Sequence, residues 1–227
     1  MPSITTIQAV KNSLSLPRIG TYEAALDSAG NPITSRQALH LYAWNAQVSA
    51  ALMAPLHICE VVVRNAVSDA LEAVYGQNWP RSVGFEQSLP APHSGYSQLK
   101  DVRAACRAHN TTGKVIPELK FVFWQKMFTA RYDNRLWVPH MARIFPGLPQ
   151  GPNSPRAIGQ YRLAIYNELD HIRTLRNRIA HHEPIFARNL ADDFRRISEL
   201  IALRCPITAD WMNQNQQVAL LIAARPV

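Results

Sequence analysis

The stretch VSAALMAPLHICEVVV, residues 48–63, is the most apolar run of the chain and indicates where its core lies. Pro55, His57 and Glu60 interrupt the run, and it is shorter than the roughly 20 apolar residues of a membrane-spanning helix. Apolar residues then recur at steps of three and four, at Leu56, Cys59, Val63, Val67, Ala70 and Val74. Such spacing places side chains on one face of a helix, so the sequence predicts a buried helix and no membrane segment.

Outside this stretch the apolar pattern is also helical, and strands do not alternate with helices. Thr34 or Ser35 can cap a helix that runs to about Leu52, and Pro55 suits the first turn of a next helix that Gly76 ends. Further helices are predicted over about 96–109, 117–131, 135–145, 156–180, 189–204 and 208–224. The predicted fold class is therefore all-α.

Proline and glycine mark the boundaries of the predicted domain. Residues 1–34 are expected to form a loose N-terminal arm with one short helix at most, and residues 35–227 a single α-helical domain. Within that domain, residues 76–155 could form an inserted lobe that starts with a loop, and residues 156–205 hold two long helices. The segment FPGLPQGPNSP, residues 145–155, is richest in proline and glycine and is expected to be a hinge.

The charge is unevenly distributed. The chain carries a net charge of +8, and residues 95–145 hold nine Lys and Arg against three acids, which accounts for +6 of it. A basic surface indicates a polyanionic partner, of which nucleic acid is the commonest. The alternative is ordinary surface charge that keeps the protein soluble.

The cysteines and the N-terminal sequence indicate the cytoplasm. Cys59, Cys106 and Cys205 are odd in number, far apart and without a CxxC pair, so free thiols in a reducing compartment are expected. The start, MPSITTIQAVKNSLSL, has no long apolar segment of the kind found in secretory signals.

The densest cluster of phosphate-binding and proton-transfer groups is RNRIAHHEP, residues 176–184, at the end of a predicted helix. Arg176 lies at the border between the apolar and polar faces of that helix, and His181 lies about 140° further round. One regular helix cannot aim both side chains into one pocket. Either the helix frays near Ala180, or two copies of the helix pack about a two-fold axis.

These residue types suffice for metal-free cleavage of RNA, in which the neighbouring 2′-OH attacks the phosphorus. An imidazole moves protons, a guanidinium binds phosphate and stabilises developing charge, and Asn177 can orient either group. Two other interpretations remain open. The histidines could interact only with the negative end of the helix, or the HHE sequence could bind a metal, although no HxxxH or HExxH spacing is present.

The segment Arg176-Asn177-Arg178-Ile179-Ala180-His181 matches the Arg-Asn-x-x-x-His form of the motif of HEPN domains. LRNRIAHHEPIF resembles more closely the Abi-like (abortive infection, AbiD/AbiF-type) branch of that family. SLPRIGTY at 15–22, LYAWN at 41–45 and PLHICEVVVRNA at 55–66 are similar to elements of the N-terminal part of the same branch. The resemblance covers about residues 15–205, and its elements occur in the family's order.

The resemblance implies an α-helical HEPN bundle that forms homodimers with the motif helices at the interface. It also implies a metal-independent, cofactor-free endoribonuclease of phage defence or a toxin system, which leaves 2′,3′-cyclic phosphate and 5′-hydroxyl ends. Arg176 and His181 would be the catalytic pair, Asn177 their polar companion, and His182 an auxiliary because it also satisfies the spacing. An antitoxin protein or a small structured RNA silences some relatives. The alternatives are a HEPN-like dimer that binds RNA or protein without cutting, and a helical adaptor.

Further residues are candidates for supporting roles. Glu60, Arg64 and Asn65 could orient the motif helix or touch RNA, although Glu60 and Arg64 could equally form an ordinary ion pair on an exposed helix. Five basic residues are predicted to contact RNA phosphates: Lys126, Arg131, Arg135, Arg173 and Arg178. Three aromatic residues among them recur at helical spacing and are expected in the core rather than stacked on bases: Phe121, Trp124 and Phe128.

Overall fold

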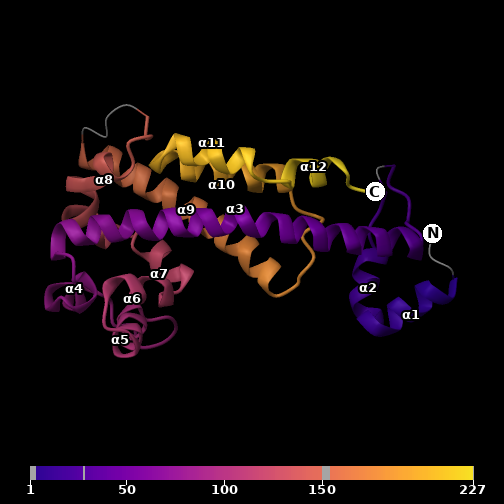
Figure 1. The fold of residues 1–227 in the computed structure, drawn as a ribbon, viewed down its shortest axis with the longest axis horizontal. Coiled ribbons are helices and arrows are strands. Elements are labelled where there is room, and N and C mark those ends of the chain that lie inside the picture. The colour runs from indigo at the N-terminus through magenta and orange to yellow at the C-terminus, as the bar shows by residue number, and fades with distance from the viewer. Residues whose placement is uncertain (1–3, 28, 150–153, 227) are drawn as a thin grey trace.

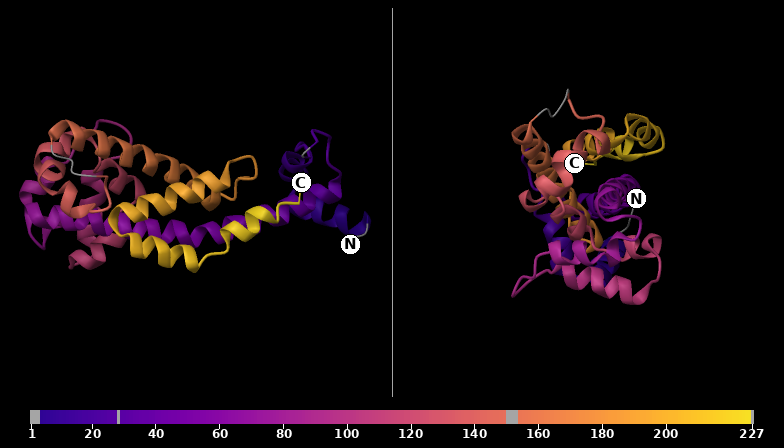
Figure 2. Two further views of the ribbon diagram at one scale, coloured as in Figure 1. Left: turned by 90° about the horizontal axis from the view of Figure 1, so that it is seen from above. Right: turned by 90° about the vertical axis from the view of Figure 1, so that its left-hand side faces the viewer.

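The computed structural model describes residues 4–27, 29–149 and 154–226. Within these ranges 75% of the structure is helical, with twelve α-helices and no strand, which confirms the all-α prediction. The molecule is elongated, and one helix, α3 (Ser35–Tyr75), runs along most of its length with the other helices arranged around it (Figures 1 and 2).

Local signals in the sequence set both ends of α3. The Thr34 side chain accepts a hydrogen bond from the Gln37 N–H, and the Gln37 side chain accepts one from the Thr34 N–H, which is a complete capping box. At the other end Gly76 stops the helix with φ 80° and ψ 172°, a backbone conformation that is essentially restricted to glycine.

Between these ends, α3 continues through Pro55 for 41 residues, so the prediction of two helices divided at Pro55 is wrong. Proline inside a helix removes one backbone hydrogen bond and costs about 3 kcal/mol. Pro55 is buried together with Leu52 and Leu56, one turn or less away. Burial on both sides of the proline holds the helix together there.

Two helices that run antiparallel to each other pack against α3: α9 (Pro155–Ala180), which ends in the motif, and α10 (Leu190–Arg204) (Figure 1). The predicted apolar seam of α9 is buried, with Ile165, Leu169, Ile172, Leu175 and Ile179 each at most 7% exposed. Arg196 on α10 donates to both carboxylate oxygens of Glu168 on α9, at 2.7 and 2.8 Å. Arg204 at the end of α10 donates to Asp69 on α3 at 2.5 Å.

The chain after α10 forms two helices rather than the single predicted one, α11 (Pro206–Gln214) and α12 (Val218–Ala223). The break occurs in the polar sequence around Asn215. The Trp44 indole N–H donates to the Leu221 carbonyl at 2.6 Å, which fastens α12 to the N-terminal half of α3.

Residues 76–144 form a group of short elements at the C-terminal end of α3 (Figure 1). In chain order these elements are η1 (Trp79–Arg81), α4 (Val83–Ser88), α5 (Gln98–Ala108), α6 (Thr112–Glu118), α7 (Phe121–Lys126), η2 (Ala130–Tyr132), η3 (Asp133–Trp137) and α8 (Val138–Ile144). Their buried side chains, including Trp79 and Trp137, belong to the same hydrophobic cluster as those of α3 and α9. The region therefore lies against the bundle and shares its core.

Three predictions for this region need correction. The loop predicted at its start contains η1 and α4, and Pro117 lies inside α6 rather than opening a helix. The helix predicted over 117–131 is broken after Lys126, where η2 and η3 follow. Phe121, Trp124 and Phe128 are buried as predicted; the first two lie on α7, and Phe128 follows it in a turn.

The N-terminal arm is not loose. It forms α1 (Ile4–Leu14) and α2 (Leu16–Glu23), and Ile19 and Tyr22 on α2 are 0% and 1% exposed. The Tyr22 ring lies 5.1 Å from the Tyr42 ring and 5.0 Å from the Phe186 ring, measured between centroids. Glycine and proline suggested mobility, but burial of these two side chains holds α2 in place, and Lys11 of α1 pairs with Glu23 of α2 at 2.7 Å.

The proposed hinge over 145–155 lies partly outside the described residues, at 150–153. Its described beginning is tied to α10, because the Gly147 N–H donates to the Leu203 carbonyl at 2.9 Å. A Cβ at Gly147 would collide with the backbone of Ala202 and Leu203, so only glycine allows this close approach.

Gly76 and Gly20 test whether Gly76 ends α3 because of its backbone conformation. A Cβ added at either glycine would meet no atom within 4 Å, so the two differ in conformation and not in space. Gly76→Ala should lower the free energy of unfolding by about 1–3 kcal/mol, because alanine rarely adopts positive φ. Gly20→Ala, inside α2, should instead raise it by about 0.5–1 kcal/mol, because its φ is ordinary. Urea unfolding followed by circular dichroism measures both free energies. Equal effects of the two substitutions would show that the positive φ of Gly76 is not what makes glycine necessary there.

Candidate functional site

The end of α9 is a hydrogen-bonded turn that contains both motif histidines. The His182 N–H donates to the Ile179 carbonyl at 3.0 Å, and the Glu183 N–H donates to the Arg178 carbonyl at 2.8 Å. This pair of bonds is the Schellman cap, which requires a left-handed residue at the position of His182. His182 has φ 55°, as the cap demands.

Glycine is the usual residue at that position, because a Cβ in the left-handed conformation costs roughly 1–2 kcal/mol. Among the described residues, only Ser15 and His182 combine a side chain with positive φ. Strain of this kind is found where surrounding contacts enforce it, and it is frequent at functional sites. The conformation of His182 is therefore a reason to look for a function at this turn.

Two segments distant in sequence and one residue of the motif itself hold the turn. Arg18 of α2 donates to the His182 carbonyl at 2.8 Å, and the Asn45 side-chain oxygen on α3 accepts from the Ile185 N–H at 2.8 Å. Arg178 donates twice to the Pro184 carbonyl, at 3.2 and 2.7 Å. Arg18 belongs to SLPRIGTY and Asn45 to LYAWN, so the structure brings two of the singled-out sequence elements onto the motif.

Arg176 and His181 do not converge within one chain. The helix remains regular through Ala180, and the His181 N–H still bonds to the Asn177 carbonyl at 2.9 Å, so the expected fraying near Ala180 is wrong for His181. The two side chains therefore keep their separation of about 140° around the axis. Asn177 lies between them: Arg176 donates to its side-chain oxygen at 3.3 Å, and Asn177 precedes His181 by one turn.

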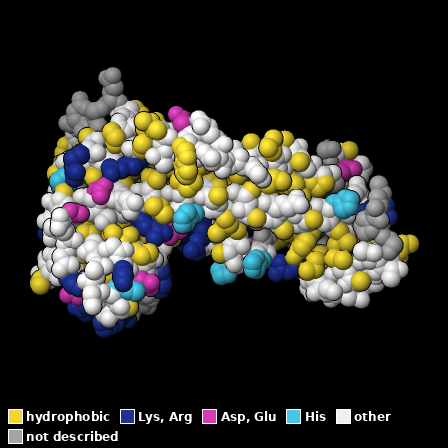
Figure 3. Space-filling model, viewed as in Figure 1, with side chains coloured by type: hydrophobic (Ala, Val, Ile, Leu, Met, Phe, Trp, Pro, Cys, Tyr) yellow, Lys and Arg dark blue, Asp and Glu magenta, His cyan; other side chains and the backbone are white. Residues whose placement is uncertain are grey.

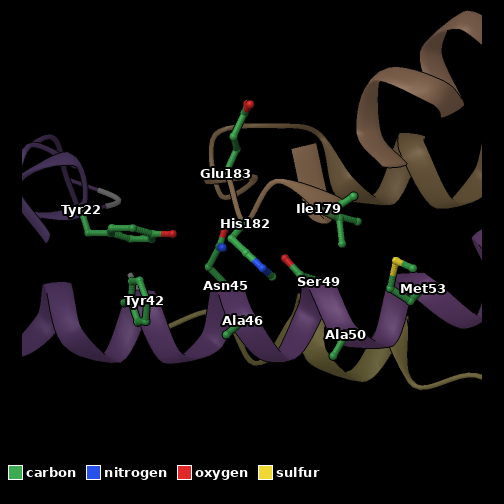
Figure 4. Close-up of a pocket in the computed structure, with 11 residues that line it drawn as sticks. Tyr22, Tyr42, Asn45, Ala46, Ser49, Ala50, Met53, Ile179, His182 and Glu183 are labelled. Carbon is green, nitrogen blue, oxygen red and sulfur yellow. The ribbon is translucent and has the colours of Figure 1, made fainter. Parts of the chain in front are cut away.

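A pocket of about 390 Å³ lies beside the turn, between α2, α3 and the end of α9 (Figure 4). His182 lines this pocket and His181 does not. Figure 4 shows the His182 imidazole lying over Asn45 and Ser49 of α3, with the Tyr22 hydroxyl pointing toward the same space. Burial, with a smaller contribution from the nearby Tyr42, raises the pKa of Tyr22 to about 12, so its hydroxyl stays protonated near neutral pH.

Sequence reasoning missed Arg18, Tyr22, Tyr42 and Asn45 as parts of the site. The available signal was that they lie in the two short elements that resemble the Abi-like branch, at 15–22 and 41–45. Nothing in their spacing revealed that they meet the motif, because the contacts join residues 140 and 164 positions apart.

Glu60 and Arg64 form an ion pair at 3.0 Å, but not on an exposed helix surface. Their side chains are only 19% and 15% exposed, and the Arg64 Nε is buried without a hydrogen-bond partner among the described residues. Helical spacing places both within about 40° of Met53, which lines the pocket. The pair thus extends the pocket-bearing face of α3, whereas Asn65 is exposed further round.

Two of the arginines predicted to contact RNA are engaged inside the chain. Arg173 donates to Gln125 of α7 and to Asp170, each at 2.8 Å, and Gln125 donates to Asp170 at 2.9 Å. This triangle joins α7 to α9, and the Arg173 hydrogen bond is the main cause of a lowered pKa at Asp170. Arg178 supports the motif turn through Pro184. Both arginines thus have structural roles in this geometry.

The other predicted contacts lie on the group of short elements. Arg131 and Arg135 are exposed, line one open pocket, and donate to the Ser88 carbonyl at 3.0 Å and the Tyr75 hydroxyl at 3.1 Å. Lys126 is partly buried at the end of α7. A further pocket of about 300 Å³ is lined by Arg81, Arg103 and Arg107.

That arginine pocket holds an unused donor. The Arg81 Nη1 is buried and finds no hydrogen-bond partner in the described part of the chain. Arg103 is paired with Glu86, so the pocket keeps a positive excess. Figure 3 shows Lys and Arg side chains gathered at this end of the molecule and few along its middle.

Across residues 4–27, 29–149 and 154–226, no three His, Cys, Asp or Glu side chains are grouped so that they could hold a metal ion. Cys59, Cys106 and Cys205 are free thiols. Comparison of the chain with models of protein families, with curated proteins and with solved structures gives no match.

A pair of substitutions measures the strain at His182. His182→Ala removes the imidazole and keeps the Cβ, whereas His182→Gly removes both. Because only glycine adopts φ 55° freely, H182G should be more stable than H182A by about 1 kcal/mol. Thermal or urea unfolding measures the difference, and an H182A protein at least as stable as H182G would show that the turn carries no strain.

Proposed function

We propose that this protein is a metal-independent endoribonuclease of the HEPN type, acting as a homodimer in phage defence or a toxin system. The observation that carries the proposal is the convergence of three sequence elements on one strained turn next to Arg176, Asn177 and His181. Each of the three resembles part of the Abi-like branch, although they lie far apart in the sequence.

The geometry suits a division of tasks between the three motif residues. His181 is exposed beyond the last turn of α9, where its imidazole can take a proton from a 2′-OH or give one to the leaving oxygen. Arg176 binds the scissile phosphate and stabilises its developing charge. Asn177 already accepts a hydrogen bond from Arg176 and orients it. Attack by the 2′-OH leaves a 2′,3′-cyclic phosphate and a 5′-hydroxyl end.

A second copy of the chain resolves the angular separation of Arg176 and His181. Packing two motif ends about a two-fold axis lets the arginine of one chain face the histidine of the other. The surface beside the motif fits such packing, because α3 has no Lys, Arg, Asp or Glu from Gln37 to Cys59. Several side chains of this segment are nevertheless exposed: Ala43, Ala46, Ala50, Met53 and Ala54.

This face of α3 is unusual for a helix in contact with water. By length and composition α3 could cross a membrane, a test that core helices also pass, and only 33% of its most apolar window is buried within the chain. An exposed apolar face supports an interaction site here, because such faces on soluble proteins are often covered by a partner. Its continuity with the pocket through Ala46, Ala50 and Met53 favours a second copy of the motif as the partner.

The basic group of short elements supports RNA as the substrate. Arg131, Arg135 and the arginine pocket provide exposed positive charge at one end of the molecule (Figure 3). Contacts of this kind follow a phosphate backbone without reading its sequence, and they weaken as salt increases. They would hold an RNA strand along the molecule while the motif cuts it.

The alternative is a HEPN-like dimer that binds RNA or a protein without cutting. The divergence of Arg176 and His181 within one chain favours this alternative if the dimer does not form. An antitoxin protein or a small structured RNA, as the resemblance implies, would cover the same face and silence the motif.

Substitution of the motif residues tests the nuclease. Arg176→Ala and His181→Ala should each lower the rate of RNA cleavage at least about a hundredfold, because removal of a charge-stabilising donor or of a general acid or base typically costs that much. Cleavage by the wild type should persist in EDTA. The measurement is gel analysis of end-labelled RNA incubated with the purified protein.

Matched controls exist on the same helix. Arg156→Ala and His171→Ala remove the same exposed side-chain types from α9 away from the motif and should leave cleavage unchanged. Full activity in R176A and H181A, or equal losses in all four variants, would refute the assigned roles. A salt-sensitive shift of RNA without cleavage by the wild type would favour the binding alternative.

A charge placed on the exposed face of α3 tests the dimer. Ala54→Lys should convert the dimer to monomers and abolish cleavage, because an unpaired charge would be buried at the interface. Ala73→Lys makes the same change at an exposed site nearer the end of α3 and should change neither property. Sedimentation at micromolar concentration measures the assembly, and a monomeric wild type would remove the basis for shared sites.

A further inference from the structure

The pocket beside His182 contains polar groups that the fold does not use. The Asn45 side-chain oxygen is bonded to Ile185, but its NH2 group donates to no described residue. The hydroxyls of Tyr22 and Ser49 and the imidazole of His182 likewise make no hydrogen bond within the described residues. Figure 4 shows all four side chains around one space.

The remaining wall of the pocket is small and apolar. Ala46 and Ala50 lie one turn apart on α3 and add a small apolar surface to the pocket. Met53 and Ile179 close the end toward the middle of α3. A flat ring can lie between such a surface and an imidazole, with its edge toward the hydroxyl and amide groups.

The charge of the lining indicates what kind of ligand fits. No Lys or Arg lines the pocket, and Glu183 is its one charged residue. A phosphate would therefore be unfavourable there, and a purely apolar ligand would displace water from the polar groups of the pocket without replacing its hydrogen bonds. A neutral, planar group with hydrogen-bonding edges meets both conditions, and a nucleobase is such a group. The volume of about 390 Å³ falls within the range of small-molecule pockets.

We propose that this pocket binds one unpaired base of the RNA substrate, next to the bond that is cut. The inference rests on the proposed nuclease function, because the base belongs to the RNA that the nuclease would cut. The base lies on Ala46 and Ala50 under the His182 imidazole, and the Tyr22 hydroxyl, the Asn45 NH2 group and the Ser49 hydroxyl contact its edge. Stacking and edge contacts of this kind are how proteins recognise unpaired bases.

The turn at the end of α9 explains why two adjacent histidines can serve different tasks. The left-handed conformation of His182 turns its imidazole into the pocket, while His181 keeps its helical direction and stays outside. Consecutive Cα atoms are about 3.8 Å apart. A base held by His182 therefore leaves its own ribose and phosphate within reach of His181, and the strained turn aligns the RNA strand for cleavage.

Filling the pocket tests the proposal independently of cleavage. The probes are the four ribonucleosides, which carry a base but no phosphate, and ribose 5-phosphate, which carries no base. Calorimetric titration of the wild-type protein should show saturable binding of at least one nucleoside and no competition by ribose 5-phosphate. Ala50→Leu should weaken that binding at least about tenfold, because the added side chain occupies the place of the base.

Two further variants keep the result interpretable. Ala73→Leu adds the same side chain to α3 outside the pocket and should bind nucleosides like the wild type. Ser49→Ala preserves the volume and removes one edge contact, so it should change the relative affinities of the four nucleosides while stacking remains.

The outcomes separate this proposal from the nuclease assignment. Absence of nucleoside binding by the wild type overturns the base pocket even if RNA is cut. Nucleoside binding that A50L abolishes supports the pocket even if RNA is never cut, in which case the nuclease assignment fails alone. If A50L changes only the assembly state and leaves nucleoside affinity intact, the pocket belongs to a contact between chains and the proposal is wrong.

Discussion

The structure depends on the continuity of α3 through Pro55. A break there would separate the capping box at Thr34 from the buried stripe that ends near Gly76, and α2, α9, α10 and α12 would lose a common surface. The proline costs about 3 kcal/mol, and each fully buried aliphatic side chain contributes about 1.5–3 kcal/mol. Leu52, Leu56 and Val63 are each at most 3% exposed, so burial on both sides outweighs the proline.

The same helix builds the candidate site. Tyr42, Asn45 and Ser49 follow one another at steps of three and four, so α3 presents them on one side to the turn that ends α9. Arg18 closes the turn from the direction of α2. Each of these elements alone would leave the turn free to adopt a relaxed conformation. Together they enforce the left-handed backbone of His182 and make its position a property of the whole assembly.

The polar residues around the motif divide into those that hold the fold and those that remain available. Arg173 and Arg178 donate to partners within the chain and stabilise α9 against α7 and against its own terminal turn. His181 is exposed, and Arg81 in the group of short elements has a donor without a partner among the described residues. In the proposed function, phosphate binding, proton transfer and base recognition fall to different groups.

The sequence by itself determined the local features: the helical class, the caps at Thr34 and Gly76, the buried seam of α9 and the inward aromatic residues near Trp124. It also located the motif at residues 176–181. Such features depend on residues within one or two turns of each other, which periodicity and capping reveal.

Only the tertiary structure decided that α3 continues past Pro55, that residues 4–23 form two helices, and that His182 rather than His181 enters the pocket. Those outcomes depend on burial and on hydrogen bonds such as Arg18 to His182 and Asn45 to Ile185, which join residues 164 and 140 positions apart and leave no periodic trace in the sequence.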